Sequence, residues 1–437
     1  MSNDLSQIND FITLEEPLLA FHPVDKQKRH IHPLRGLSEH GPYSQLLFEG
    51  FEKIRIAFVF PDGYRGKAIG LFNELKNTFD PKERKNYLPK YEGFEKVFRL
   101  GIEYATKECH QIISSAEEEQ LRKSEKPHLK LAEIMANTIR RMGTVRHAFD
   151  VAVIYLPMRW KNYFKVSTEN EDFDLHDFIK VTGAQHAIPI QIISEGSFGQ
   201  YFCRCSVMWR LSIALYCKTG GIPWKLATED SDTAFIGISY AVKQHSQDQN
   251  RFITCCSQIF DGDGSGLEFL LYETECNNKL SRNPYLNRDD MRRILARSLA
   301  LYQRRHAGRS PKRVIIHKTT EFKDAEIKGC FDAFQNININ LIQIQDDVIW
   351  RGVKFGTAFD RQQNKTVLTP TPYPCDRGVA LRWQSDEVLL WTQGDVSSIS
   401  QNNASYFKEG KGIPSPLLLR FYAGCEDWQE QCEILHF

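Results

Sequence analysis

Apolar runs in the first half of the chain alternate with longer stretches of helical spacing. The runs Ile54–Pro61, Asp150–Pro157 and Ile188–Ser194 are almost continuously apolar, which predicts strands buried on both faces of a parallel sheet. Helices are predicted between and after them, at about residues 68–79, 116–141, 174–186 and 205–218. This alternation predicts a Rossmann-like α/β domain, and the absence of a GxGxxG motif indicates that it is not a dinucleotide-binding one.

The second half of the chain has a different order of predicted elements. Three strands come first, at Ala234–Val242, Arg251–Phe260 and Leu267–Glu273, and they predict an antiparallel meander. A long helix (288–306), a strand (Arg313–Lys318), a helix (324–334) and a strand (Ile339–Gln345) follow. Meander, helix, strand, helix and strand is the order of an RNase H-like fold.

These patterns divide the chain into three regions. Residues 1–50 are expected to form an N-terminal arm, because the stretch His32–Ser44 is rich in proline, histidine and glycine and predicts irregular structure. Residues 51–220 form the predicted Rossmann-like domain and residues 221–437 the RNase H-like domain. The boundary is placed at the glycine- and proline-containing segment Thr219–Ala227.

Composition narrows the class of protein. Of the 437 residues, 41% are hydrophobic, which is typical of packed globular domains, and the net charge of +1 alone does not indicate a nucleic-acid partner. No apolar run is long enough for a membrane span, so a cytoplasmic protein without a membrane partner is expected. The closest cysteine groups, Cys203/Cys205 and Cys255/Cys256, lack the spacing of a zinc or redox motif, and reduced thiols are expected.

Seven short sequence stretches together resemble one protein family. They are LRGL and GPYS near the start, FDLHDFIK (173–180), IPIQII (188–193), KTGGIPWKLA (218–227), FIGIS (235–239) and VIIHKTTEF (314–322). In this order they resemble the short prokaryotic Argonautes of bacterial defence systems. The resemblance implies a MID domain that captures the 5′ end of a guide strand, a PIWI domain that cradles the guide–target duplex, and no PAZ domain.

Four polar residues of the first domain are candidates for binding the guide 5′-phosphate. A phosphate needs several converging cations and donors, and His176 and Lys180 stand four residues apart on one helix face. Gln191 lies on the next strand and Lys218 ends the following helix. By resemblance the four match the family's phosphate-pocket motif, whereas His176 and Lys180 taken alone would more often be a solvated helix face.

The PIWI-like half lacks carboxylates where the family's nucleases carry them. Two-metal hydrolysis needs acidic side chains at strand ends. The resemblance places the first acid after FIGI, where this chain has Ser239, and the second at Thr319. No catalytic residue and no catalytic metal are therefore expected. Asp261 and Asp263 in the DGDGSG segment do not match the spacing of an EF-hand and are interpreted as a solvated hairpin turn.

A basic stretch in this half is a candidate surface for the duplex backbone. Between Arg288 and Lys318 there are ten Lys or Arg residues and two acids. Arg293, Arg297 and Arg304 fall on one face of the predicted helix, a pattern suited to phosphate contacts. An ordinary charged outer face is an equally good interpretation.

The resemblance implies a non-cleaving recognition subunit. Its guide is expected to be a 5′-phosphorylated RNA and its target single-stranded DNA. Its partner is expected to be an APAZ-containing effector with a TIR, sirtuin-like or nuclease domain, acting against plasmids or phage. The cofactor that the resemblance suggests is Mg²⁺ at the guide 5′-phosphate. The alternatives are a scaffold subunit that binds no nucleic acid and, less favoured, a guide-directed nuclease.

Overall fold

The chain is divided by its internal contacts into two compact units. The computed structural model describes residues 11–48, 52–85, 87–168, 172–196, 201–228, 232–243, 251–266, 270–275, 285–371, 375–396 and 413–436. The first unit is Leu19–Trp224, and the second unit is Met1–Leu18 with Lys225–Phe437. The boundary follows Trp224, four residues beyond the predicted residue 220. The expected N-terminal arm, residues 1–50, is divided between the units after Leu18.

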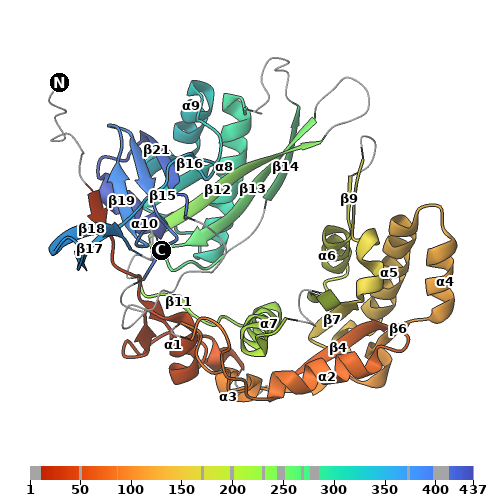
Figure 1. Cartoon of the computed structure of the whole chain (residues 1–437). Helices are drawn as coiled ribbons and strands as arrows, with labels where there is room; N and C mark the ends of the chain where they lie inside the picture. Colours follow the sequence, from red (N-terminus) through yellow and green to blue (C-terminus); the bar gives the residue numbers. More distant parts are fainter. Residues whose placement is uncertain are drawn as a thin grey trace. The chain divides into compact units, whose positions relative to one another are not determined.

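The first unit contains the predicted parallel sheet, with strand order β10-β7-β4-β5 and β6 paired with β4 (Figure 1). All six residues of β7 are buried, as the continuous apolar run predicted. The strands of this unit are β2 (Leu19–Ala20), β3 (Arg29–His30), β4 (Lys53–Pro61), β5 (Gly101–Tyr104), β6 (Gln111–Ile113), β7 (Val151–Leu156), β8 (Lys165–Ser167), β9 (Asp172–Asp174) and β10 (Ile190–Ser194). Its helices are α1 (Pro33–His40), α2 (Arg65–Lys76), α3 (Phe94–Phe98), α4 (Ser115–Lys123), α5 (Pro127–Gly143), α6 (Leu175–Gln185) and α7 (Arg204–Lys218).

The structure corrects two predictions in this unit. The stretch His32–Ser44 is not irregular throughout, because it contains helix α1. Its N-cap is His32, whose Nδ1 accepts hydrogen bonds from the backbone N–H groups of Leu34 and Arg35, and a proline occupies the first turn. The single helix expected at 116–141 is two helices, α4 and α5, because α4 ends at Lys123 and Pro127 starts a new helix.

The second unit is built on a nine-stranded sheet of order β1-β19-β20-β21-β16-β15-β12-β13-β14. Strands β12, β13 and β14 form the predicted antiparallel meander, and β15 and β16 continue the sheet in parallel to β12. The α/β, RNase H-like order is confirmed. The strands are β1 (Phe11–Thr13), β11 (Lys225–Leu226), β12 (Thr233–Lys243), β13 (Arg251–Asp261), β14 (Leu270–Glu275), β15 (Arg313–Lys318), β16 (Asn338–Gln345), β17 (Phe355–Asp360), β18 (Lys365–Pro370), β19 (Val379–Arg382), β20 (Glu387–Leu390) and β21 (Leu417–Ala423).

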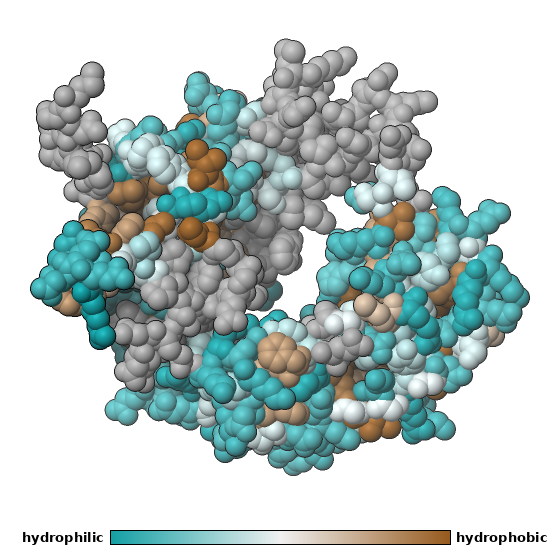
Figure 2. Space-filling model, in the orientation of Figure 1, coloured by the Kyte–Doolittle hydropathy of each residue, from teal (hydrophilic) through white to brown (hydrophobic). Residues whose placement is uncertain are grey.

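Helices cover both faces of this sheet. Helices α8 (Arg288–Arg305) and α9 (Asp324–Ala333) pack on one face, through side chains that include Ile294 and Cys330. Helix α10 (Trp428–His436) packs on the other face, against a cluster that includes Ile315 and Ile342. Neither α8 nor any other helix of the described ranges is long and apolar enough to cross a membrane. The face of the molecule seen in Figure 2 is mostly hydrophilic where it is described.

A buried ion pair joins β15 to α9. The Lys318 ammonium donates to a carboxylate oxygen of Glu326 at 2.6 Å, and both side chains are 0% exposed. Tyr240 on β12 and the backbone N–H of Leu286 donate to the other Glu326 oxygen, at 2.8 and 3.1 Å. Three aromatic rings, those of Tyr240, Tyr285 and Phe322, lie 5.2 to 5.3 Å from the ammonium. The pair therefore links β12, β15, α9 and the start of α8.

Replacing either partner of this pair should destabilise the second unit strongly. Lys318→Met or Glu326→Met leaves a buried charge unpaired, which should lower the free energy of unfolding by about 3–5 kcal/mol. The double variant leaves no unpaired charge and should recover most of that stability. Urea denaturation of the full chain measures the stability of the second unit in the two single variants and in the double variant. The partly exposed pair Lys354–Asp376 is the control, with an expected coupling below about 1 kcal/mol. Single variants as stable as the parent would contradict this role.

Candidate functional site

Helix α6 presents Lys180 to the edge strand of the first sheet. The helix begins after Asp174, whose carboxylate accepts a hydrogen bond from the backbone N–H of His176 at 2.8 Å. One turn into the helix, the Lys180 ammonium donates to the backbone carbonyl of Ile190, the first residue of β10, at 2.6 Å. The side chain is half-buried, so its charge lies at a fixed place beside the sheet.

A second cation, Lys218, lies next to Lys180. Lys218 is the last residue of α7, and its side chain is also partly buried. Burial, followed by repulsion from Lys218, lowers the pKa of Lys180 to about 8. Within the described part of the chain, no carboxylate forms an ion pair with either ammonium. Two like charges held together without a counter-ion form a site that an anion would stabilise.

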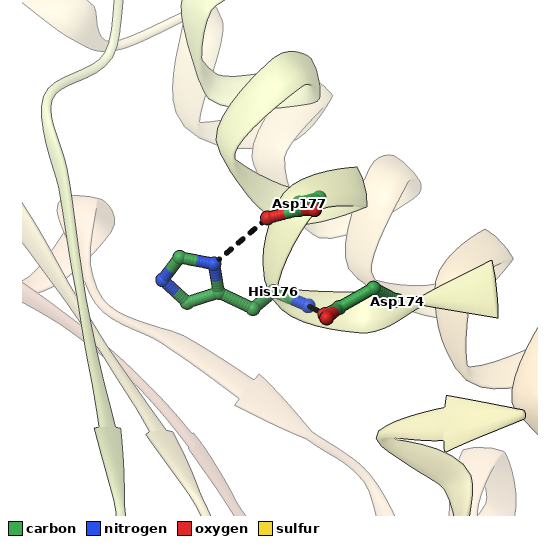
Figure 3. Close-up of side chains that lie close together, drawn as sticks. All are labelled: Asp174, His176 and Asp177. Carbon is green, nitrogen blue, oxygen red and sulfur yellow. Dashed lines mark hydrogen bonds and ion pairs between the residues drawn. The ribbon is translucent and has the colours of Figure 1, made fainter. Parts of the chain in front are cut away.

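The other two predicted residues, Gln191 and His176, make side-chain contacts with other groups. Gln191 follows Ile190 directly, and its side-chain amide donates to the backbone carbonyl of Ile192 at 2.9 Å. His176 lies one turn before Lys180, and its Nδ1 lies 3.1 Å from the Asp177 carboxylate (Figure 3). The exposed imidazole therefore remains accessible to a ligand. Sequence reasoning missed the Asp177 contact and the Ile190 carbonyl, although the adjacent acid at position 177 was a visible signal.

The start of α6 also brings three possible metal ligands together. Ligand atoms of Asp174, His176 and Asp177 all lie within 4.8 Å of one another (Figure 3). However, one oxygen of Asp174 caps the helix and the other forms an ion pair with Lys165 at 2.6 Å. The Lys165 hydrogen bond lowers the pKa of this carboxyl. These partners satisfy Asp174 without a metal, and the group is exposed, so we assign no metal to it.

The parallel pairing of β12 with β15 ends directly before the two positions where acids were expected. Gly237 pairs with His317 and Ile238 with Lys318 in the parallel β12–β15 ladder. Ser239 is the next residue of β12, and Thr319 is the first residue after the end of β15. Since Ile238 is buried against α8 and α9, strand alternation turns Ser239 to the opposite face of the sheet. Each of the two expected acid positions is therefore occupied by a hydroxyl residue, Ser239 within β12 and Thr319 directly after β15.

The predicted basic face is present on α8 and is exposed. Arg293, Arg297 and Arg304 are exposed, while Ile294 and Tyr302 are buried in the core as expected. Arg293 pairs with Asp290 at 3.1 Å. Because α8 covers the face opposite to Ser239, these arginines lie on the far side of the sheet from it. Their role as a duplex surface stays a prediction.

Solved structures show which proteins share this fold. No family model matches the chain, and no curated protein matches it in sequence. Among solved structures, the Argonaute of Aquifex aeolicus with externally bound siRNA is similar with a TM-score of 0.57 and 15% identity, covering 97% of this chain and 49% of that one. The Argonaute of Marinitoga piezophila, described in complex with 5′-OH guide RNA and target DNA, has a TM-score of 0.54 and 11% identity, covering 98% and 54%.

The chain has a mixed α/β fold that matches the MID and PIWI regions of Argonautes. It spans about half the length of the structures it matches. At these identities the likeness establishes the fold and leaves the activity to be argued from the residues.

The lowered pKa of Lys180 predicts a measurable pH dependence of stability. Between pH 8 and pH 10 the folded chain binds fewer protons at Lys180 than the unfolded chain, so this group makes stability rise with pH. Compared with Lys180→Met, the parent should therefore gain about 1 kcal/mol from pH 7 to pH 10, after allowance for solvent screening. Chemical denaturation at both pH values measures this difference, with Lys123→Met as the surface-lysine control. A difference that does not change with pH would argue against the burial of Lys180 beside Lys218.

Proposed function

We propose that this chain is a short, catalytically inactive prokaryotic Argonaute that binds a 5′-phosphorylated guide strand. The observation that carries the proposal is the Lys180–Lys218 pair, two partly buried cations held together without a carboxylate partner in the described ranges. A terminal phosphate carries nearly two negative charges and would relieve their repulsion. Gln191 and His176 would supply further hydrogen bonds to the phosphate or to the first nucleotide.

The phosphate, rather than a 5′-hydroxyl, is the group that this site favours. The Argonaute of Marinitoga piezophila is described with a 5′-OH guide RNA. A hydroxyl would leave the repulsion between Lys180 and Lys218 in place, whereas a dianion would form two charge-assisted hydrogen bonds. We infer an RNA guide and a single-stranded DNA target, a preference that the family resemblance and the guide RNA and target DNA of that neighbour support.

The described donors of this pocket do not suit a resident Mg²⁺ ion. Mg²⁺ binds carboxylate, phosphate and water oxygens, while Lys180 and Lys218 offer ammonium groups that repel it. The Ile190 carbonyl is already engaged by Lys180. The ammonium groups can balance the phosphate charge, so we assign no step to a metal.

We further propose that the chain pairs guide and target without cutting the target. Two-metal hydrolysis needs acids that Ser239 and Thr319 do not supply, because neutral hydroxyls are weak ligands for divalent cations. Recognition would then have to be converted into a response by another protein. The family resemblance supports an APAZ-containing effector in that role, with the response directed against plasmids or phage.

Reversing the charge at Lys180 should remove the preference for a 5′-phosphate. The parent is expected to bind a short 5′-phosphorylated RNA at least about tenfold more tightly than its 5′-OH counterpart, and Lys180→Glu should bind both equally weakly. Fluorescence anisotropy at several salt concentrations measures the four affinities. The control is Lys123→Glu, a charge reversal at an exposed residue of α4. Parent binding that ignores the phosphate would instead favour the scaffold alternative.

The purified chain should leave its paired target intact. A complementary DNA labelled at one end, incubated with the guide-loaded chain and Mg²⁺ or Mn²⁺, is expected to remain full length because both acid positions are neutral. A product cut at a fixed distance from the guide 5′ end would contradict this. The Lys180→Glu variant identifies contaminating nucleases, since their cleavage would not depend on guide binding.

A further inference from the structure

Strands β17 and β18 form a hairpin that is not part of the nine-stranded sheet of the second unit (Figure 1). Within the described part of the chain the two strands pair only with each other. The base of the hairpin is fixed, because the Lys354 ammonium pairs with Asp376 at 2.6 Å and the backbone N–H of Thr371 donates to the Lys354 carbonyl at 2.9 Å. A two-stranded hairpin is only marginally stable by itself in water, so a third strand would stabilise this one.

One face of the hairpin is apolar and exposed. The register places six residues on this face, in the pairs Phe355–Pro370, Thr357–Leu368 and Phe359–Thr366. All six are exposed, and none of them carries a charge. The side chains of Phe355, Phe359 and Leu368 are 55%, 60% and 71% exposed. An exposed apolar patch on a folded protein is often an interaction site.

The two edges of the hairpin differ in how open they are to another strand. Strand β18 begins with Lys365 and ends with Pro370, and lysine and proline on an edge hinder pairing with a further strand. Strand β17 contains neither residue type, and its central residues Gly356, Thr357 and Ala358 are small. The outer backbone N–H and C=O groups of β17 are therefore the ones to which a strand can be added.

The size of the apolar face distinguishes a second copy of the chain from a short segment. Because a fully exposed aromatic side chain offers about 150–250 Å², Phe355, Phe359 and Leu368 together expose roughly 350 Å². A stable dimer needs about 800 Å² from each partner. An extended segment needs less apolar area, because its main chain also forms hydrogen bonds with the edge of the sheet. The face therefore fits a segment better than a second copy.

We propose that the outer edge of β17 binds an extended segment of a partner protein, which adds a third strand to the hairpin. Side chains at every second position of the added strand point to the apolar face and pack against Phe355 and Phe359. These positions of the segment are apolar, because the face offers no charged group to pair with a polar one. This surface belongs to the second unit and does not depend on the Lys180–Lys218 pair.

The test begins with a phage-displayed library of random eight-residue peptides, selected on the immobilised full chain. The selected peptides should have apolar residues at every second position. Phe359→Lys and the uncharged Phe359→Ser should each raise the Kd of a synthetic selected peptide at least about tenfold, because the apolar contact is lost. Ala358→Lys is the matched control, since it changes an exposed residue of the same strand on the opposite face and should leave the Kd unchanged.

A second measurement tests the pairing of the main chains. The N–H groups of alternate residues point to opposite edges of a strand, so N-methylation of every second residue blocks one edge of the peptide only. One of the two methylated forms should bind at least about tenfold more weakly than the parent peptide, and the other should keep its affinity.

A lack of selected peptides, a helical spacing of their apolar residues, or a Kd unchanged by Phe359→Lys would each overturn the proposal. So would a dimer of the full chain that Phe359→Lys dissociates in sedimentation equilibrium, because a second copy would then occupy the face. Phe359→Lys should bind a 5′-phosphorylated guide RNA as the parent does, and Lys180→Glu should bind the selected peptide as the parent does. Failure of this surface is thereby distinguished from failure of the proposed guide site.

Discussion

The approach of Lys180 to Lys218 is the constraint on which the proposed chemistry of this protein depends. Burial, followed by repulsion from Lys218, disfavours the charged form of Lys180 and lowers its pKa to about 8. The fold maintains this arrangement through α6, α7 and β10, and the Ile190 carbonyl fixes one of the two ammonium groups. Packing in the rest of the first unit offsets the free-energy cost of this repulsion. A bound anion would reduce that cost.

The arrangement of Lys180 and Lys218 differs from a glycine-rich phosphate-binding loop, and the site proposed for the guide 5′-phosphate would not need one. Each ammonium comes from a helix that packs beside the edge strand β10, so side chains supply the charge. Backbone N–H groups of a loop would bind any anion, whereas two fixed ammonium groups favour an anion that carries two charges. If the proposed site binds a phosphate, this preference would favour the doubly charged end of a strand over the singly charged phosphates within it.

Much of this fold could be predicted because its strands are continuous apolar runs. Strand β15 matches the predicted Arg313–Lys318, and α8 ends one residue before the predicted helix does. Helix α1 was missed because its capping residue is a histidine and Gly36 interrupts its pattern, although that glycine lies against the ring of Phe21 with no room for a side chain. The predicted residues 267–269 lie outside the described residues. The pairing of β1 with β19 joins distant parts of the chain, and local patterns carry no signal for it.

The sequence suggests which residues form the candidate site, but it does not predict how their side chains are arranged. Spacing placed His176 and Lys180 on one helix face, yet the contact of Lys180 with Lys218 depends on how two helices pack. Side chains of β12 alternate between the two faces of the sheet, and this limits which residues could contact a duplex. Ser239 faces away from α8, so a duplex lying over Ser239 and Thr319 could not reach Arg297 and Arg304. A duplex bound on the face of Ser239 would need other residues to contact its phosphates.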